Sequence, residues 1–257
     1  MIDIHSHILP GVDDGSKDMD MTLKMLREAA SDGTKKIVAT PHYCREFDYL
    51  EYSIVKDMVY KLKNKIKEEN INIEVFCGQE IYYEENILEW YNENKIGTIN
   101  DTRYMLIELP LNKFDINKVI DTIYEIQIKG IVPILAHPER YLPFMDNPEK
   151  INDFINEGFL FQMNSGSING RFGKSAKKTS EIFLENRIYS FIGSDAHNDS
   201  NRKTGISEAL EIIKDIDNEY NKIFEENSIK MLNNEEVNFI GSQIKKKKKG
   251  LFSIFRK

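Results

Sequence analysis

The chain alternates short apolar runs with longer amphipathic segments. The short runs are rich in β-branched residues and five to ten residues long, which is typical of buried strands. Seven of them are predicted to be strands, at residues 1–5, 35–40, 71–80, 104–110, 131–137, 159–164 and 189–195. This strict alternation of strand and helix favours a parallel sheet covered by helices.

The segments between the strands have helical periodicity and end at glycine. Residues 20–33 and 115–130 are two examples, with Gly33 and Gly130 as the predicted stops. Seven strand–helix units fill about 240 residues without a linker or a change in composition. We therefore predict a single α/β domain, residues 1–243, folded as a closed (β/α)7 barrel. An open doubly wound sheet is the alternative.

Composition narrows the class of protein. The chain has 257 residues, two cysteines and no apolar stretch near the roughly 20 residues that a membrane-spanning helix needs. Two cysteines are too few for a disulfide framework, and the N-terminus does not resemble a signal peptide. We expect a cytoplasmic protein.

The charge is distributed unevenly along the chain. The net charge is −7, but KKKKKGLFSIFRK at residues 245–257 has seven positive charges and no acid, which leaves −14 on residues 1–244. An acidic body argues against a nucleic-acid partner, whose binding surface is normally basic. Residues 244–257 are predicted to be a disordered tail. Three roles are possible for this tail. It is expected to contact anionic lipid at the inner face of the cell membrane; the alternatives are docking on an acidic kinase tail and simple solubilisation of the terminus.

Residues with metal-binding side chains gather at the ends of the predicted strands. All five histidines lie at or just past a C-terminal strand end: His5, His7, His42, His137 and His197. Three carboxylates follow the same rule: Glu80, Glu108 and Asp195. Active sites of (β/α) barrels form at this end of the strands. Imidazole with carboxylate suits zinc, manganese or iron, whereas an all-oxygen site would suit magnesium or calcium.

Four of these positions form two pairs with a spacing of two residues. His5 and His7 form one pair, and Asp195 and His197 form the other. Residues i and i+2 of a strand point to one face, so each pair can converge on one ion. Because the first and last strands of a closed barrel are neighbours, the two pairs are predicted to meet. Glu108 supports a functional site further, since an unpaired carboxylate within an apolar strand is costly.

Five stretches together resemble one family: IDIHSHILPGVDDGS, GQEIYY, LIELP, AHPERY and GSDAHN. Over nearly its whole length the chain is similar to the PHP superfamily (polymerase and histidinol phosphatase). Within it, the chain most resembles the manganese-dependent tyrosine-protein phosphatases of Gram-positive capsule and exopolysaccharide loci. The resemblance implies a distorted (β/α)7 TIM-like barrel with three divalent metal ions. Manganese is expected, with iron or zinc as alternatives.

The resemblance also implies a set of ligands. The first ion would be held by His5, His7, Glu80 and Asp195. The second would share Glu80 as a bridge and add Glu108 and His137. The third would use Asp14, His42 and His197, although Asp13 and Asp14 before Gly15 also suit a simple turn. Two arginines match positions that the family uses to handle phosphate: Arg140 and Arg202.

The activity implied is hydrolysis of phosphotyrosine by a metal-activated hydroxide. The implied substrate is a phosphorylated tyrosine kinase that regulates polysaccharide synthesis. A cysteine-dependent phosphatase is excluded, because it needs arginine six residues after the cysteine, and Leu50 and Tyr83 stand there after Cys44 and Cys77. The alternatives are a small-molecule phosphatase such as histidinol-phosphatase, an amidohydrolase, or an inactive metal-binding scaffold. Residues 164–178, NSGSINGRFGKSAKK, are expected to form a loop on the same rim.

Overall fold

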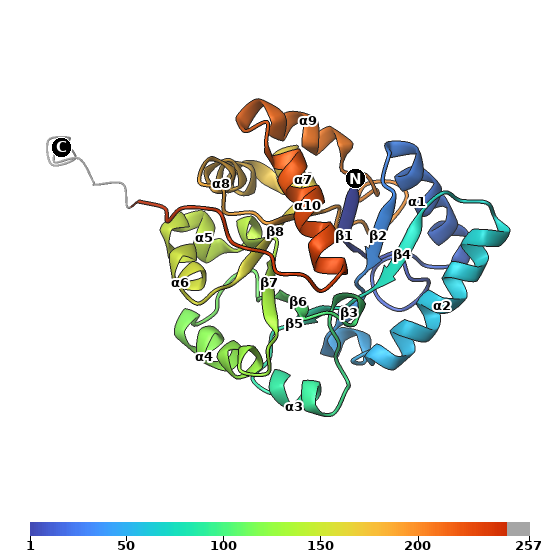
Figure 1. The fold of residues 1–257 in the computed structure, drawn as a ribbon, viewed down its shortest axis with the longest axis horizontal. Helices are drawn as coiled ribbons and strands as arrows, with labels where there is room; N and C mark the ends of the chain where they lie inside the picture. The colour runs from blue at the N-terminus through green and yellow to red at the C-terminus, as the bar shows by residue number, and fades with distance from the viewer. Residues whose placement is uncertain (246–257) are drawn as a thin grey trace, which may run out of the picture.

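A computed structural model describes residues 1–245 and places parallel strands in the middle of the molecule with helices around them (Figure 1). Within these residues the strands are β1 (Ile2–Ser6), β2 (Lys36–Ala39), β3 (His42–Tyr43), β4 (Glu74–Cys77), β5 (Glu80–Tyr82), β6 (Tyr104–Glu108), β7 (Val132–Ala136), β8 (Leu160–Asn164) and β9 (Phe191–Gly193). All the pairings between neighbouring strands are parallel, as predicted from the alternation of strand and helix.

The described strands form two sheets that continue into one another. Their orders are β1-β2-β4 and β3-β5-β6-β7-β8-β9, and two residues separate β2 from β3 and β4 from β5. The ring closes between β9 and β1, where Ser6 pairs with Ala196 and the His7 amide donates to the Ala196 carbonyl at 2.9 Å. Counting each interrupted strand once, residues 1–245 contain seven strand positions. The predicted distorted (β/α)7 barrel is confirmed.

The second and third strands differ from the prediction because each is broken. Pro41 follows β2 and has no backbone N–H to continue the ladder. The third strand starts at Glu74, three residues later than predicted, and is interrupted at Gly78 and Gln79. Beyond both breaks the chain pairs again, with His42 opposite Glu80. Each break therefore comes directly before a residue that reaches the site, His42 in one strand and Glu80 in the other.

The helices pack outside the strands. They are α1 (Met19–Asp32), α2 (Tyr52–Glu68), α3 (Ile87–Asn92), α4 (Ile116–Gln127), α5 (Leu142–Asp146), α6 (Ile151–Asn156), α7 (Ser165–Ile168), α8 (Gly173–Glu185), α9 (Ser207–Ile216) and α10 (Tyr220–Leu232). Short 3-10 turns are η1 (Arg45–Phe47), η2 (Ile99–Asp101), η3 (Pro138–Arg140) and η4 (Pro148–Lys150). Helix α1 ends at Gly33, with φ 98°, as predicted. Helix α4 ends at Gln127, before the predicted stop at Gly130.

The apolar side chains of each strand alternate between two sides of the barrel wall. One buried cluster collects residues from strands all round the ring, including Ile4, Val38, Leu106 and Ile134, and therefore fills the interior. The alternate positions pack against the helices in two further clusters. Met231 near the end of α10 joins the interior cluster, so this helix contributes to the barrel core.

The described chain ends against the barrel. Ile244 exchanges two hydrogen bonds with the Asn152 side chain, both at 2.9 Å. Residues 246–257 of the predicted tail lie outside the described residues. The boundary of the tail at residue 244 stays a prediction. Across residues 1–245, no helix combines the length and apolar character needed to cross a membrane.

Candidate metal centre

The interior rows of the barrel change from apolar to polar at the C-terminal ends of the strands. On β6, Leu106 lies in the interior cluster and Glu108 follows it two residues later on the same side. Phe191 of β9 is followed in the same way by Gly193 and Asp195. The local alternation that builds the core therefore also points the polar side chains into the mouth of the barrel.

All nine predicted ligands lie at this end. Seven of them form three overlapping groups, and His137 and Asp195 lie beside these groups. His5, His7 and Glu80 form the first group. The Nε2 atoms of His5 and His7 are 3.2 Å apart and lie 3.1 Å and 3.2 Å from Glu80 Oε2. Asp195 Oδ1 lies 3.7 Å from His5 Nε2, so the two predicted pairs do meet across the β1–β9 closure. Metal–ligand bonds of about 2.0–2.2 Å place neighbouring donor atoms at about such separations.

The second group contains His42, Glu80 and Glu108, with His137 beside it. His137 Nε2 is 3.0 Å from Glu80 Oε1 and 3.6 Å from Glu108 Oε1. His42 Nδ1 is 3.2 Å from Glu80 Oε2 and 3.8 Å from Glu108 Oε2. The two oxygens of Glu80 therefore face different imidazoles, which is the arrangement that a bridging carboxylate needs.

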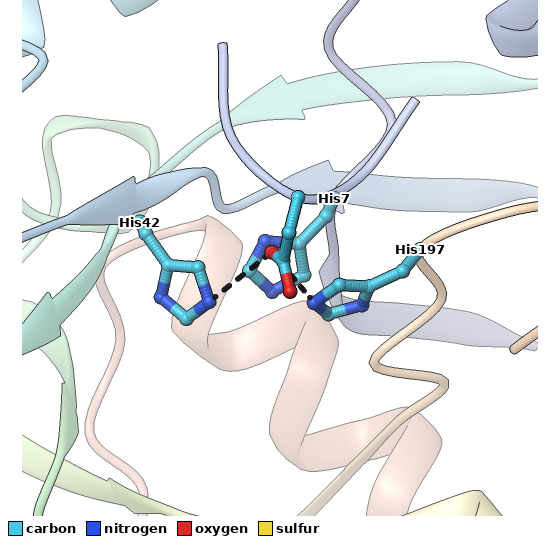
Figure 2. Close-up of side chains that lie close together, drawn as sticks. His7, His42 and His197 are labelled. Atoms are coloured by element: carbon cyan, nitrogen blue, oxygen red, sulfur yellow. Dashed lines mark ion pairs between the residues drawn. The ribbon is translucent and has the colours of Figure 1, made fainter. Parts of the chain in front are cut away.

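The third group contains His7, Asp14, His42 and His197. Figure 2 shows the three imidazoles turned toward one carboxylate. Asp14 Oδ1 lies 3.1 Å from His197 Nε2 and 3.6 Å from His42 Nε2. His7 thus belongs to the first and third groups, and His42 to the second and third. The structure brings the predicted residues together, and the division of ligands among ions stays a proposal.

Outer hydrogen bonds fix the orientation of three imidazoles. His7 Nδ1 lies 2.7 Å from Asp13 Oδ2, and His5 Nδ1 lies 2.9 Å from Gln162 Oε1. His197 Nδ1 lies 3.0 Å from the Asp195 carbonyl oxygen. An Nδ1–H donated to these oxygens leaves the Nε2 lone pair of each ring for a metal.

Two of these orienting residues were missed in the sequence. From the sequence, Asp13 suits a simple turn; in the structure it also accepts hydrogen bonds from the backbone amides of Gly15 and His42. Gly15 allows the turn to close over His7, because a Cβ there would lie 2.2 Å from the His7 carbonyl oxygen. Gln162 had a detectable signal, since it interrupts the apolar run FLFQMN.

The electrostatics of the site fit divalent cations. Burial raises the pKa of Glu108 well above its usual value, and the charges of Glu80 and Asp195 raise it further. Burial opposes ionisation of Glu80 as well, but His5 and His42 hold its pKa well below the usual range. Buried His42 Nδ1 has no hydrogen-bond partner among the described residues despite its approach to Glu80. Crowded carboxylates with imidazole nitrogens are the donor set of manganese, iron or zinc.

The two predicted arginines also reach the site. Arg140 Nη1 donates to Asp195 Oδ2 at 2.9 Å, and Arg202 Nη2 donates to Asp195 Oδ1 at 2.7 Å. Arg202 stands at the end of a tight turn in which Asn198 Oδ1 accepts its backbone amide at 3.0 Å. In the same turn the His197 amide donates to the Arg202 carbonyl. The turn therefore sets a candidate ligand and a guanidinium side by side.

The segment expected to form a rim loop is mostly helical. Residues 164–178 contain α7 and the start of α8, separated by a short connection that includes Phe172. Arg140 Cζ lies 4.3 Å from the centroid of the Phe172 ring. The segment does border the site, and an aromatic side chain, Phe172, makes this contact.

Comparison with known proteins gives relatives over the whole chain. Residues 1–233 match the family described as Capsular polysaccharide synthesis, CpsB/CapC. The tyrosine-protein phosphatase YwqE of Bacillus subtilis (strain 168) is 34% identical over 256 residues, which cover 99% of this chain and 100% of that protein. The putative tyrosine-protein phosphatase CapC of Staphylococcus aureus is 36% identical over 204 residues, 79% of each chain.

Solved structures show the same relationship. A chain from the crystal structures of YwqE from Bacillus subtilis and CpsB from Streptococcus pneumoniae, described as unique metal-dependent tyrosine phosphatases, has a TM-score of 0.91 and 32% identity. The match covers 96% of this chain and 100% of that one. A histidinol phosphate phosphatase from Lactococcus lactis has a TM-score of 0.55 at 15% identity, covering 84% of this chain and 93% of that one. The latter likeness is one of fold alone.

Proposed function

The chain belongs to the CpsB/CapC family of capsular polysaccharide synthesis, and from this premise we propose how its metal centre removes phosphate from tyrosine. The protein is a metal-dependent tyrosine-protein phosphatase. The observation that supports the proposal most is the convergence of five histidines, four carboxylates and two arginines on one end of the barrel. A small-molecule phosphatase is less favoured, because histidinol phosphate phosphatase shares only the fold.

We propose that the three overlapping groups hold three divalent ions, with manganese as the expected metal. When bound, such ions supply a nucleophilic hydroxide at neutral pH and neutralise charge on the phosphoryl group. Glu80 spans the first two groups, and Asp13 and Gln162 keep the Nε2 atoms of His7 and His5 directed at the centre.

The two arginines are proposed to bind the phosphoryl oxygens. Each donates one N–H to Asp195 and keeps other N–H groups for an anion. Arg202 Nε is buried and has no partner within residues 1–245. Planar guanidinium groups match phosphate oxygens, and phosphoryl transfer depends on such charge neutralisation. The phenolate that leaves has a reference pKa of about 10, so it needs less protonation than an alkoxide.

The test combines metal analysis with two substrates. Purified protein loaded with manganese, iron or zinc is assayed on a phosphotyrosine peptide and on histidinol phosphate. The proposal expects metal-dependent turnover of the peptide and much slower turnover of histidinol phosphate. Faster turnover of histidinol phosphate would favour the small-molecule alternative.

Chelation is expected to abolish the activity, whereas alkylation of thiols is expected to leave it unchanged. Burial raises the pKa of the Cys77 thiol to about 12, and burial also raises the pKa of Cys44. Neither thiol is therefore activated as a nucleophile. Activity is measured after iodoacetamide treatment, with metal content and modified cysteines quantified. Inactivation that follows modification of either cysteine, with metals retained, would contradict this prediction.

The family role in capsular polysaccharide synthesis supports a phosphorylated tyrosine kinase as the substrate, and the tail is proposed to bring the enzyme to an anionic membrane. Deleting residues 245–257 is expected to leave turnover of a small phosphotyrosine substrate unchanged and to abolish salt-sensitive binding to anionic vesicles. Each cation near such a surface contributes about 1 kcal/mol. Binding is measured by co-sedimentation, with neutral vesicles as the control. Equal binding with and without the tail would reject the membrane role.

A further inference from the structure

Two partly exposed aromatic side chains, Phe47 and Phe172, stand over residues of the metal centre. Phe47 ends η1, which follows β3, and Phe172 precedes α8, which follows β8. These strands are the second and sixth of the seven strand positions around the barrel. The two phenyl rings therefore approach the site from different sides.

Phe172 is held by close packing. A Cβ on Gly166 would lie 2.9 Å from Phe172 Cε2 and 3.2 Å from Arg171 Cδ, so the absence of a side chain at this position admits the ring. The Arg171 amide donates to the Gly166 carbonyl at 2.9 Å and fixes the same turn. With Arg140 Cζ 4.3 Å from its centroid, the ring forms a wall beside a phosphate-binding guanidinium.

Phe47 is held by an anchored loop. Its ring stacks on His42 with a centroid distance of 5.5 Å and an interplanar angle of 13°. Asp48 and Tyr49, which follow it, have φ of 52° and 51°, a backbone conformation that non-glycine residues rarely adopt. Tyr49 holds this conformation, because its hydroxyl donates to Glu84 at 2.9 Å and its ring packs 5.3 Å from Trp90.

We propose that Phe47 and Phe172 bind the aromatic ring of phosphotyrosine and make the site select aryl over alkyl phosphates. The inference rests on the proposed function and names the residues that set its specificity. Once the phosphoryl group lies among the arginines and the metal ligands, the ester oxygen and the ring beyond it point toward the rim. Flat apolar faces there contact a phenyl ring at the 4.5–7 Å centroid distances of aromatic pairs. A serine or threonine side chain has no such face to offer.

A purely supporting role for the two rings predicts a different outcome. If they only hold His42 and Arg140 in place, replacing them weakens the binding of every phosphate equally. If they bind the substrate ring, the loss is confined to ligands that contain one. The comparison of an aryl ligand with inorganic phosphate therefore separates the two roles.

The experiment uses the full chain loaded with metal and the variants Phe47→Leu and Phe172→Leu, which keep apolar bulk without the flat face. Calorimetry measures the affinity of a peptide containing phosphonomethyl-phenylalanine, a non-hydrolysable analogue, and of inorganic phosphate. We expect the ratio of peptide affinity to phosphate affinity to fall about 10-fold in each variant. Tyr60→Leu, at a 68% exposed aromatic residue on α2, is the matched control and should leave the ratio unchanged.

A ratio of affinities that stays unchanged in both leucine variants would overturn the inference, and this includes the case in which the affinities for both ligands fall equally. Turnover of a phosphotyrosine peptide by the unmodified protein is measured in parallel. Absence of that turnover would contradict the proposed function, whereas the affinity ratio reports on ring binding alone.

Discussion

Replacing His5 and His7 together by alanine is expected to lower phosphotyrosine turnover by a factor on the order of 1,000 or more and to reduce the bound metal. Both Nε2 atoms converge on Glu80 Oε2, so the double change removes two donors from one point. His7 also lies beside Asp14 and His197, so the change alters the surroundings of a second proposed ion site.

The fold is expected to survive this double substitution with reduced stability. Both histidines are fully buried, and their loss removes one hydrogen-bond partner from Asp13 and one from Gln162. Each unsatisfied buried group costs about 1–3 kcal/mol, but neither histidine belongs to the hydrophobic clusters. Circular dichroism and thermal unfolding measure this.

The matched control is Ser6→Ala, between the two histidines. The Ser6 hydroxyl donates to the Val38 carbonyl at 2.7 Å and is not among the proposed ligands. This variant should lose about 1 kcal/mol of stability and keep its metal and its activity. Near-wild-type turnover in the metal-reloaded His5→Ala, His7→Ala protein would refute the assignment of the centre.

Arg140→Ala is expected to reduce kcat/KM for a phosphotyrosine peptide by about 100-fold, and Arg140→Lys by about 10-fold. The guanidinium of Arg140 donates to Asp195 and lies over the Phe172 ring. A lysine restores the charge but neither the planar fork nor the stacking, so it should recover part of the activity.

Metal content distinguishes loss of phosphate binding from loss of the centre. Both Arg140 variants should retain their ions, because arginine is not among the proposed ligands. Arg27→Ala serves as the control. Arg27 lies on α1 and forms a surface ion pair with Glu69 at the end of α2, and its loss is expected to leave kcat/KM unchanged. Equal activity of the wild type and the Arg140→Ala and Arg140→Lys variants would exclude Arg140 from the site.

The sequence by itself determined the barrel and the end at which its site forms. Alternation of apolar runs and amphipathic segments depends on local periodicity, and parallel strands place all their C-terminal ends on one side. Histidines and carboxylates at those ends therefore had to gather once the barrel closed. The spacing of His5 with His7, and of Asp195 with His197, predicted their meeting for the same reason.

Only the tertiary structure decided which atoms face one another. Glu80 directs its two oxygens at different imidazoles, and His7 belongs to two groups. Both facts depend on how far along the barrel axis β1 and the interrupted third strand place these side chains. Gln162 and Phe172 reach the site from β8 and the segment after it. Strand ends follow from local pattern, whereas side-chain partners depend on register, strand breaks and loop closure between segments far apart in the chain. Those contacts form only in the packed fold.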